Sequence, residues 1–189
     1  MFFLQHTSRR RRQAQRSLYP AIAWYDGSAS EPAQEVLRNT LSSACDVIGA
    51  DRGFTLQTRE EAVLEVACAH RIVREELLDV VLGCAARALH QALVCGQLGL
   101  VDDSGLLPHE AEGTEHAPVV VALPLDLGGG QRGVLCLLRS GSPRALSDLD
   151  LEILGALADQ AALAVRAANQ ESALSKLAAS LHAFAPQLV

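Results

Sequence analysis

The stretch "PVVVALPLDLGGGQRGVLCLLR" (Pro118–Arg139) decides the fold of this chain. Its centre, Gly128 to Gly133, has the G-x-G-x-x-G spacing of dinucleotide-binding loops, which must open a helix to bring backbone amides to the phosphates. Here the glycines are followed by a short apolar run that "SGSPR" (140–144) stops, which is typical of a strand. We therefore predict a β-hairpin turned by glycines and exclude a dinucleotide-binding loop.

The residues before this hairpin predict a helix followed by two strands. Residues 31–48 have helical periodicity, with Ser30 as the expected N-cap and Gly49 as the expected end. Residues 53–58 alternate like a strand, and residues 63–71 form the expected partner strand. On that partner we expect one face to carry Leu64, Val66, Cys68 and His70.

The middle of the chain predicts one further helix, a short strand and a loop. Residues 74–91 ("REELLDVVLGCAARALHQ") carry apolar stripes at helical spacing, with Arg87 and His90 on the polar side. Residues 92–101 are expected to form a strand, and residues 102–116 an acidic loop. The loop contains His109 and His116 among acidic residues, and we interpret it as solvated rather than as a metal site because no regular element fixes the spacing.

The longest expected element is a helix from Ser147 to about residue 185, opened by a capping box in "SDLD". Its far half carries apolar residues at coiled-coil spacing, whereas the positions before them in the same register are less apolar. The far residues are Leu174, Leu177, Leu181 and Phe184, and the earlier positions include Gln160, Ala167 and Gln170. We expect this stripe to pack on a second copy in a two-fold dimer. In the rival arrangement, "LYPAIAWY" (18–25) folds back over it.

Composition and charge narrow the possible partners. The formal net charge is −6 despite the five arginines of residues 1–20, so an acidic body is a poor surface for nucleic acid. The Arg9–Arg12 cluster is interpreted as a solvated terminus rather than as a contact with lipid or nucleic acid. The sequence has no apolar run of transmembrane length and no signal peptide at its start, which predicts a cytoplasmic protein without a membrane span.

The five cysteines, an odd number without a C-x-x-C pair, fit reduced thiols better than a disulfide framework. Cys45, Cys68 and Cys136 lie in apolar stripes or strands, so we expect them to be buried as small hydrophobic side chains. No metal site and no cofactor is predicted.

With these elements in this order, residues 31–169 resemble the GAF domain family, in its bacterial type. The matching pieces are "GADRGFTLQ" (49–57), "APVVVALPLDLGGGQRGVLCLLRS" (117–140) and "ALSDLDLEILGALADQAALAVRAAN" (145–169). The resemblance implies an α+β fold, similar to the PAS and profilin folds. Its antiparallel sheet has about six strands, with helices on both sides and a long C-terminal helix.

The resemblance also implies a division of the chain. Residues 1–28 would be an N-terminal basic extension, residues 29–169 a GAF-like domain, and residues 170–189 a C-terminal helical extension continuous with the last domain helix. A pocket for a small molecule would be lined by residues 64–70, 77–90 and 94–103. The candidate pocket residues are His70, Val81, Cys84, Cys95 and Asp102. Their surroundings are mostly apolar, which favours a small organic ligand, or none, over a polyphosphate.

Specific branches of the family are tested by their motifs. The cyclic-nucleotide signature Asn-Lys…Phe…Asp-Glu is missing, since the sole lysine is Lys176, and so is the Cys-His pair of bilin-binding members. A haem would need an axial ligand such as His70 or His90, and no motif supports one. The free methionine-(R)-sulfoxide reductase branch uses clustered cysteines. Cys84 and Cys95 lie in the corresponding region, but residues 102–116 lack the later cysteine of that branch.

The sequence therefore predicts a non-enzymatic cytoplasmic regulatory module that senses a small molecule and dimerises through its terminal helices. It would act on a partner signalling protein. A dimerisation or scaffold module without a ligand is the alternative, and an enzyme similar to the sulfoxide reductases is the third hypothesis.

Overall fold

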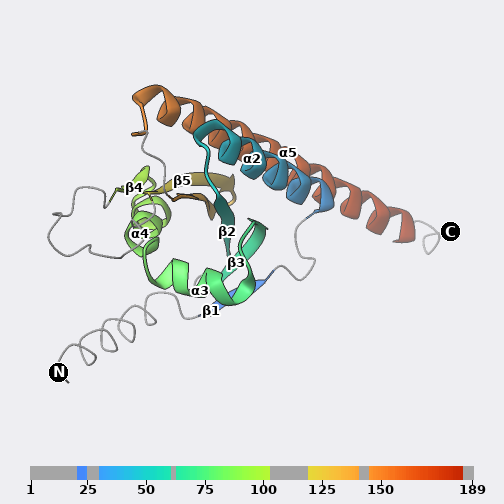
Figure 1. Ribbon diagram of the computed structural model, residues 1–189. Coiled ribbons are helices and arrows are strands. Elements are labelled where there is room, and N and C mark those ends of the chain that lie inside the picture. Colours follow the sequence, from blue (N-terminus) through green and yellow to red (C-terminus); the bar gives the residue numbers. More distant parts are fainter. Residues whose placement is uncertain (1–20, 25–29, 61–62, 103–118, 141–144, 185–189) are drawn as a thin grey trace, which may run out of the picture.

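A computed structural model describes residues 21–24, 30–60, 63–102, 119–140 and 145–184 (Figure 1). The elements in chain order are β1 (Ala21–Trp24), α2 (Glu31–Ile48), β2 (Arg52–Glu60), β3 (Val63–His70), α3 (Arg74–Leu82), α4 (Ala86–Cys95), β4 (Gly99–Val101), β5 (Val119–Gly128), β6 (Gln131–Arg139) and α5 (Asp148–Phe184). The expected basic extension before residue 21 and nearly all of the expected acidic loop lie outside the described residues.

The strands form one six-stranded sheet in the order β1-β3-β2-β6-β5-β4. This confirms the predicted α+β class, with about six strands and a long last helix. Every neighbouring pair is antiparallel except β1 and β3, which run parallel, so the sheet is mixed rather than wholly antiparallel. Strand β1 was not predicted, because four residues give too little alternation to identify a strand.

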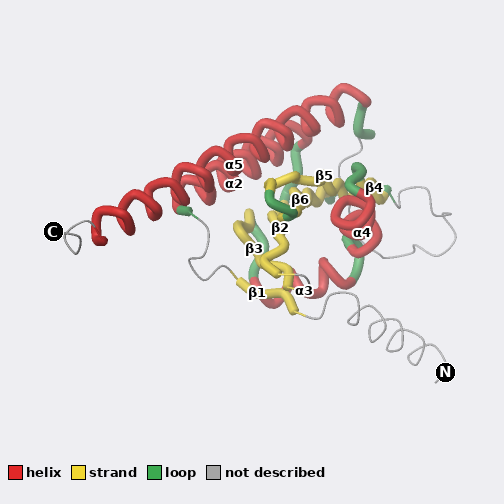
Figure 2. Tube along the Cα trace, turned by 180° about the vertical axis from the view of Figure 1, so that it is seen from behind, coloured by secondary structure: helices red, strands yellow, loops and turns green. Residues whose placement is uncertain are grey.

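Helices cover both faces of the sheet (Figure 2). Helices α2 and α5 lie side by side on one face, here called the α2–α5 face, where they bury Leu37, Leu41, Leu154 and Val165 against strand residues such as Leu123 and Leu135. Helices α3 and α4 cover the opposite face, here called the α3–α4 face. The central strands β5 and β6 thus bury both of their faces over most of their length, which is why they hold apolar residues at consecutive positions.

The hairpin of β5 and β6 forms as predicted. Gly128, Gly129 and Gly130 have φ angles of 79°, 62° and 83°, which residues other than glycine rarely adopt. The Asp126 carboxylate accepts a hydrogen bond from the Gly128 amide at 3.1 Å. Strand β6, and no helix, follows the glycines, so the loop cannot aim helix N-terminal amides at a phosphate.

The prediction that Leu64, Val66, Cys68 and His70 share one face of β3 is wrong beyond Val66. Thr55 pairs with Cys68 and Leu56 pairs with Val66, so Ala67 is an extra residue, a β-bulge. The bulge reverses which residues point to each face. Leu64 and Val66 belong to the α3–α4 face, whereas Ala67 and Cys68 pack on the α2–α5 face.

The single helix predicted over residues 74–91 is two helices. Helix α3 ends at Leu82, and Gly83 adopts φ −105° and ψ −113°, a combination that a Cβ atom would oppose, since it would lie 2.6 Å from the Asp79 carbonyl oxygen. Helix α4 then runs through residues 92–95, which were predicted to be strand, and only Gly99–Val101 is extended. Within the described part of the chain, no single helix is long and apolar enough to cross a membrane. The pair α3 and α4 reaches that length and hydropathy only when taken together across a 76° bend.

The two serines expected to cap helices behave differently. The Ser147 hydroxyl accepts from the Asp150 amide at 3.2 Å, while the Asp150 carboxylate accepts from the Ser147 amide at 2.9 Å and from its hydroxyl at 2.8 Å. This confirms the capping box of α5. Ser30 makes no side-chain cap, and its hydroxyl donates to Asn169 Oδ1 at 3.3 Å instead.

Candidate functional site

The α3–α4 face holds an apolar cluster between the sheet and the two short helices. Strands supply Phe54, Leu56, Leu64, Val66, Val120, Ala122, Val134, Cys136 and Leu138, and the helices supply Leu77, Val80, Val81, Ala88, Leu89, Ala92 and Leu93, all of them buried. Ile22, Trp24 and Cys84 pack at its margin. Sequence analysis missed the contribution of Ile22 and Trp24 because it did not find β1.

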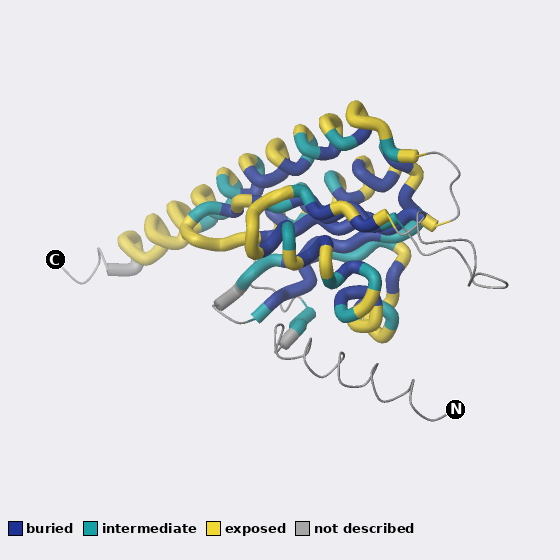
Figure 3. The backbone as a smooth tube through the Cα atoms, turned by 90° about the vertical axis from the view of Figure 1, so that its left-hand side faces the viewer, coloured by how far each residue is buried: buried dark blue, intermediate teal, exposed yellow. Residues whose placement is uncertain are grey.

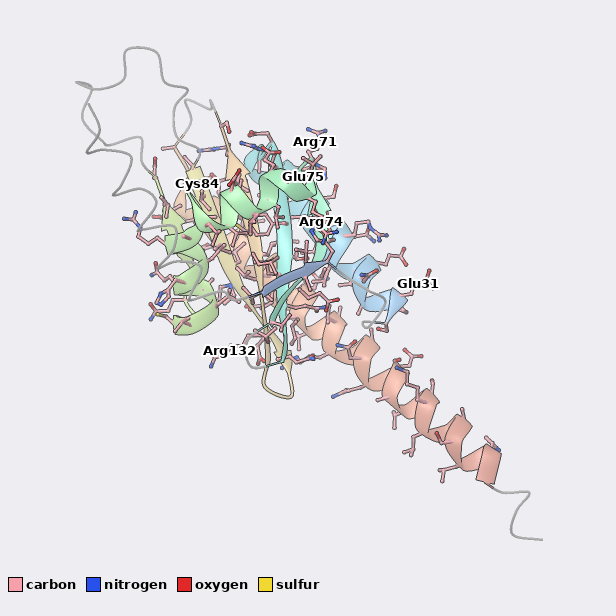
Figure 4. All side chains as sticks on the ribbon, turned by 90° about the horizontal axis from the view of Figure 1, so that it is seen from below. Glu31, Arg71, Arg74, Glu75, Cys84 and Arg132 are labelled. Carbon is pink, nitrogen blue, oxygen red and sulfur yellow. The ribbon has the colours of Figure 1, made fainter. Side chains whose placement is uncertain are left out.

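The structure brings two of the five candidate pocket residues together in this cluster. Val81, a residue of α3, is fully buried, and Cys84 lies half-buried in the turn between α3 and α4 (Figure 4). Cys95 is exposed as the last residue of α4, and Asp102 is exposed directly after β4.

His70 lies on the other face of the sheet. It is directly opposite Gly53 in the β2–β3 ladder, and opposed residues of an antiparallel pair point to the same face. A Cβ atom on Gly53 would meet Leu41 and Cys45 of α2, so this position faces the α2–α5 side. The bulge at Ala67 accounts for the displacement of His70 from the expected pocket wall.

Two charged contacts hold the start of α3 to the sheet. The Arg74 guanidinium lies 5.9 Å from the ring centroid of Trp24 in β1, which is within the range of a cation–π contact. Glu76, in the first turn of α3, forms a salt bridge with Arg52 of β2. Acidic residues at this end also favour the helix through its dipole.

The end of α4 is held by the hairpin. Arg132 Nη1 donates to the carbonyl oxygens of Leu93 and Val94, at 3.1 and 3.2 Å, and so satisfies acceptors that the last helical turn leaves open. Strand β4 packs against the same helix so closely that a Cβ atom on Gly99 would lie 2.2 Å from the Ala88 carbonyl oxygen. Figure 4 shows Arg132 and Cys84 near opposite ends of α4.

The thiols divide into buried and accessible groups. Cys45 and Cys136 are buried as predicted, whereas Cys68 is half-buried. Burial, with a smaller contribution from Asp46, raises the pKa of Cys45 to about 11, and burial also raises the pKa values of Cys68 and Cys136. A thiol whose pKa is raised is a poor nucleophile.

Cys84 and Cys95 lie at opposite ends of α4, so a rise of 1.5 Å per residue separates them by roughly 15 Å. That is well beyond the Cα separation of a disulfide. Among the described residues, no three His, Cys, Asp or Glu side chains cluster in a way that could hold a metal ion.

The outer side of α5 carries exposed leucines. The exposed fractions of Leu174, Leu177 and Leu181 are 67%, 58% and 63%. Phe184 is the last residue of α5, and its side chain lies outside the described part. Upstream, Leu149, Ile153 and Leu163 are exposed as well, which sequence analysis missed. Figure 3 shows exposed positions along the outer side of the helix and buried ones along its inner side.

The rival arrangement, in which residues 18–25 cover this stripe, is wrong for residues 21–24. They form β1 at the edge of the sheet, next to β3. In both Figure 1 and Figure 2, β1 and the C-terminal end of α5 lie in different parts of the molecule.

A six-stranded sheet between a long helical pair and a pair of short helices defines an α+β protein of the GAF-like class. The chain belongs to the GAF domain family, since the family model described as "GAF domain" matches residues 30–166. No curated protein matches the sequence significantly.

Three solved structures illustrate the fold. The GAF-B domain of DevS from Mycobacterium smegmatis superposes with a TM-score of 0.55 at 21% identity, covering 75% of this chain and 98% of that one. A methyl-accepting chemotaxis protein (residues 122 to 287) gives 0.53 at 21% identity, covering 75% and 93%. The GAF domain/HD domain protein from Geobacter sulfurreducens gives 0.52 at 17%, covering 72% and 93%. At these identities, the likenesses show that the chain shares the fold of these domains.

Proposed function

We propose that this chain is a regulatory module that binds a small apolar molecule on its α3–α4 face and acts on a signalling partner as a homodimer joined through α5. The observation that carries the proposal is the row of exposed leucines on the far half of α5. Each large apolar side chain left in water costs about 1.5–3 kcal/mol relative to a buried one. A second copy of the same helix removes that cost on both chains at once.

The α3–α4 face supports the ligand part of the proposal. Helices α3 and α4 have only 9 and 10 residues, and the break at Gly83 separates them. Helices of that length depend on packing rather than on their own stability. The side chains beneath them are apolar, so a ligand that parts them from the sheet would itself be small and mostly apolar.

Native mass spectrometry of the purified protein tests this part directly. We expect either a retained small organic molecule or a rise in the melting temperature when a library of such molecules is added. Calorimetry with ATP and with cyclic nucleotides should show no binding. Tight binding of either nucleotide would contradict the proposal.

A dimerisation or scaffold module without a ligand is the alternative, and the complete burial of Val81 and Leu89 favours it. A filled interior needs no further occupant. If this alternative holds, the protein retains no molecule, no compound raises its melting temperature, and the dimer forms regardless.

The dimer is tested by light scattering at micromolar concentration. We expect a dimeric wild type and a monomeric Leu177→Glu/Leu181→Glu variant with unchanged circular dichroism of the domain. Ser175→Glu/Ala179→Glu is the matched control, because it adds the same charge to the same turns away from the leucine row. A monomeric wild type refutes the dimer. A dimer that survives the leucine substitutions places the interface elsewhere.

GAF domains are generally sensory rather than catalytic. The separation of Cys84 and Cys95 across α4 argues against a reductase that uses both thiols. Cys84→Ser and Cys95→Ser should therefore leave any signalling output intact. Thiol-dependent turnover of free methionine sulfoxide by the wild type would contradict this.

A further inference from the structure

The two edge strands of the sheet are fastened differently. Strand β4 is held by tight contacts, because Val101 is buried and Gly99 lies against the α4 backbone at Ala88. Among the described strands, β1 pairs with β3 alone, over four residues, and its residues 22–24 are half-buried rather than buried. A short edge strand is stabilised by its one neighbour and by the side chains that it buries. Strand β1 is therefore the edge that detaches more easily.

Strand β1 covers one margin of the apolar cluster on the α3–α4 face. In the parallel register, Ile22 is the partner of Leu64, and Trp24 is the partner of Val66. Leu64 and Val66 are buried members of the cluster, and the side chains of Ile22 and Trp24 pack against it. Departure of β1 would therefore expose this part of β3 and would vacate the space of a flat indole ring at the margin.

Arg74 lies over the ring of Trp24 at the same margin. Its guanidinium is 5.9 Å from the ring centroid, near the outer limit of a cation–π contact. Arg74 is exposed, and no described residue forms a salt bridge with it. Figure 4 shows Arg74 beside β1, which is blue there. The cation is thus placed over an aromatic face and can still bind an anion.

Helix α3 does not depend on β1 for its position. Glu76 in its first turn forms a salt bridge with Arg52 of β2. Leu77 and Val81 are buried in the cluster between the helix and the sheet. Strand β1 can therefore leave while α3, and with it Arg74, stays on the sheet.

We infer that β1 is a displaceable strand and that the molecule which displaces it is a planar aromatic anion. The ring of this molecule takes the place of the Trp24 ring against Leu64 and Val66, and its anionic group binds Arg74. An uncharged ring gains the same apolar contacts without the ion pair. This inference rests on the proposed ligand site, and it names the entrance to that site and the class of its ligand.

A disulfide between β1 and β3 tests the displacement. Ala21→Cys/Val63→Cys joins two register partners, in a full-length Cys95→Ser background because Cys95 is exposed. The probe is anilinonaphthalene sulfonate, an aromatic anion whose fluorescence rises in apolar surroundings. The oxidised variant should bind the probe about 10-fold or more weakly than the reduced variant, and dithiothreitol should restore binding. Equal affinities in the two states would overturn the inference.

A cross-link at the opposite edge is the matched control. Leu100→Cys/Val121→Cys joins β4 to β5 in the same background. Its oxidation should leave the affinity for the probe unchanged, because β1 remains able to leave. An equal loss of affinity at both edges would show that binding does not depend on β1, and the inference would then fail.

Removal of the Trp24 ring tests whether the probe takes its place. Trp24→Ala should tighten the binding of anilinonaphthalene sulfonate by about 3- to 10-fold, since no ring has to leave first. Circular dichroism checks that the variant is folded. Weaker binding would show that Trp24 is part of the site rather than the group that is displaced, and would overturn the inference.

The role of the charge on Arg74 is tested with two probes. Arg74→Gln should weaken the binding of the sulfonate by about 10-fold and leave the binding of phenylnaphthylamine, its uncharged analogue, unchanged. Arg87→Gln, at an exposed position on α4, is the matched control and should affect neither probe. Equal weakening of both probes by Arg74→Gln would show that Arg74 acts only through the position of α3. That result would overturn the assignment of an anion.

Failure of this inference can be distinguished from failure of the proposed function. If a compound of another class raises the melting temperature and hydrogen exchange in β1 does not change, the proposed ligand site stands and this inference fails. If the wild type binds neither probe and no library compound, the ligand part of the proposed function fails as well.

Discussion

Thr55 and Cys68 face each other across β2 and β3, with Thr55 Oγ1 and Cys68 Sγ 3.0 Å apart. The Thr55 hydroxyl oxygen also accepts from the Cys68 backbone amide at 3.1 Å. This double contact lies where the β-bulge interrupts the ladder, so a side chain supplies a hydrogen bond in place of the backbone. The bulge, and with it the face on which His70 lies, is thus fixed in part by one buried hydroxyl.

Thr55→Val should destabilise the fold by about 1–3 kcal/mol, because it leaves the half-buried Cys68 amide without its acceptor at nearly constant volume. Thr58→Val is the matched control. Thr58 makes the same kind of double contact, with the Arg132 amide at 2.9 Å and its carbonyl at 3.1 Å, but at an exposed position where water can substitute. Urea denaturation compares the two, and equal losses would contradict this account.

Two glycines should respond in opposite directions to alanine. Gly99→Ala brings a Cβ atom against the α4 backbone at Ala88 and should cost about 1–3 kcal/mol. Gly155 lies inside α5 with nothing within 4 Å of the added carbon, so Gly155→Ala should stabilise by about 0.5–1 kcal/mol. Thermal and urea unfolding measure both changes. A tolerated Gly99→Ala would show that β4 and α4 separate easily.

Arg132→Ala should loosen the end of α4, since it removes both hydrogen bonds to the Leu93 and Val94 carbonyls and a charge that favours the helix terminus. We expect the free energy of unfolding to fall by about 1 kcal/mol. Relative to the wild type, hydrogen exchange should accelerate more in α4 than in α2. Gln131→Ala, at the neighbouring exposed position, should change neither quantity. Uniformly faster exchange over the domain would indicate a general loss of stability instead.

The raised pKa of Cys45 predicts a loss of stability at alkaline pH. The folded state holds the thiol neutral up to about pH 11, whereas an unfolded thiol ionises near its ordinary pKa of 9.0. The contribution of the neutral Cys45 thiol to stability is therefore fully present below pH 9 and declines as the pH rises toward 11. Urea unfolding between pH 8 and pH 11 should show a shallower decline in Cys45→Ala than in the wild type. Parallel curves would contradict the assignment.

The sequence predicted those elements whose signals are local. The β5–β6 hairpin is specified by its glycines, and the start of α5 by Ser147 and Asp150. The break at Gly83 also has a local signal, a glycine inside a helical pattern. It was missed because apolar residues continue at helical spacing through the break.

Other features depend on contacts between distant residues. The bulge at Ala67 exists only in relation to β2, so alternation within β3 cannot reveal it. His70 was misplaced as a consequence, and Trp24 was missed because a four-residue parallel edge strand carries almost no pattern. The exposed apolar residues Leu149, Ile153 and Leu163 on the upstream part of α5 were overlooked because α5 is apolar on two sides there. Only the structure shows that Leu154 points inward and Ile153 outward.

Helix α5 is a single helix of 37 residues whose inner side packs on β5 and whose outer side carries the exposed leucines. Since a rigid helix cannot twist one side without the other, a roll of its inner side over the sheet turns the outer side by the same angle. The C-terminal part of α5, beyond Asn169, where the helix extends past the sheet, would turn by the same angle. Any movement of the domain that rolls α5 would therefore reach the far end of the helix as rotation rather than as displacement.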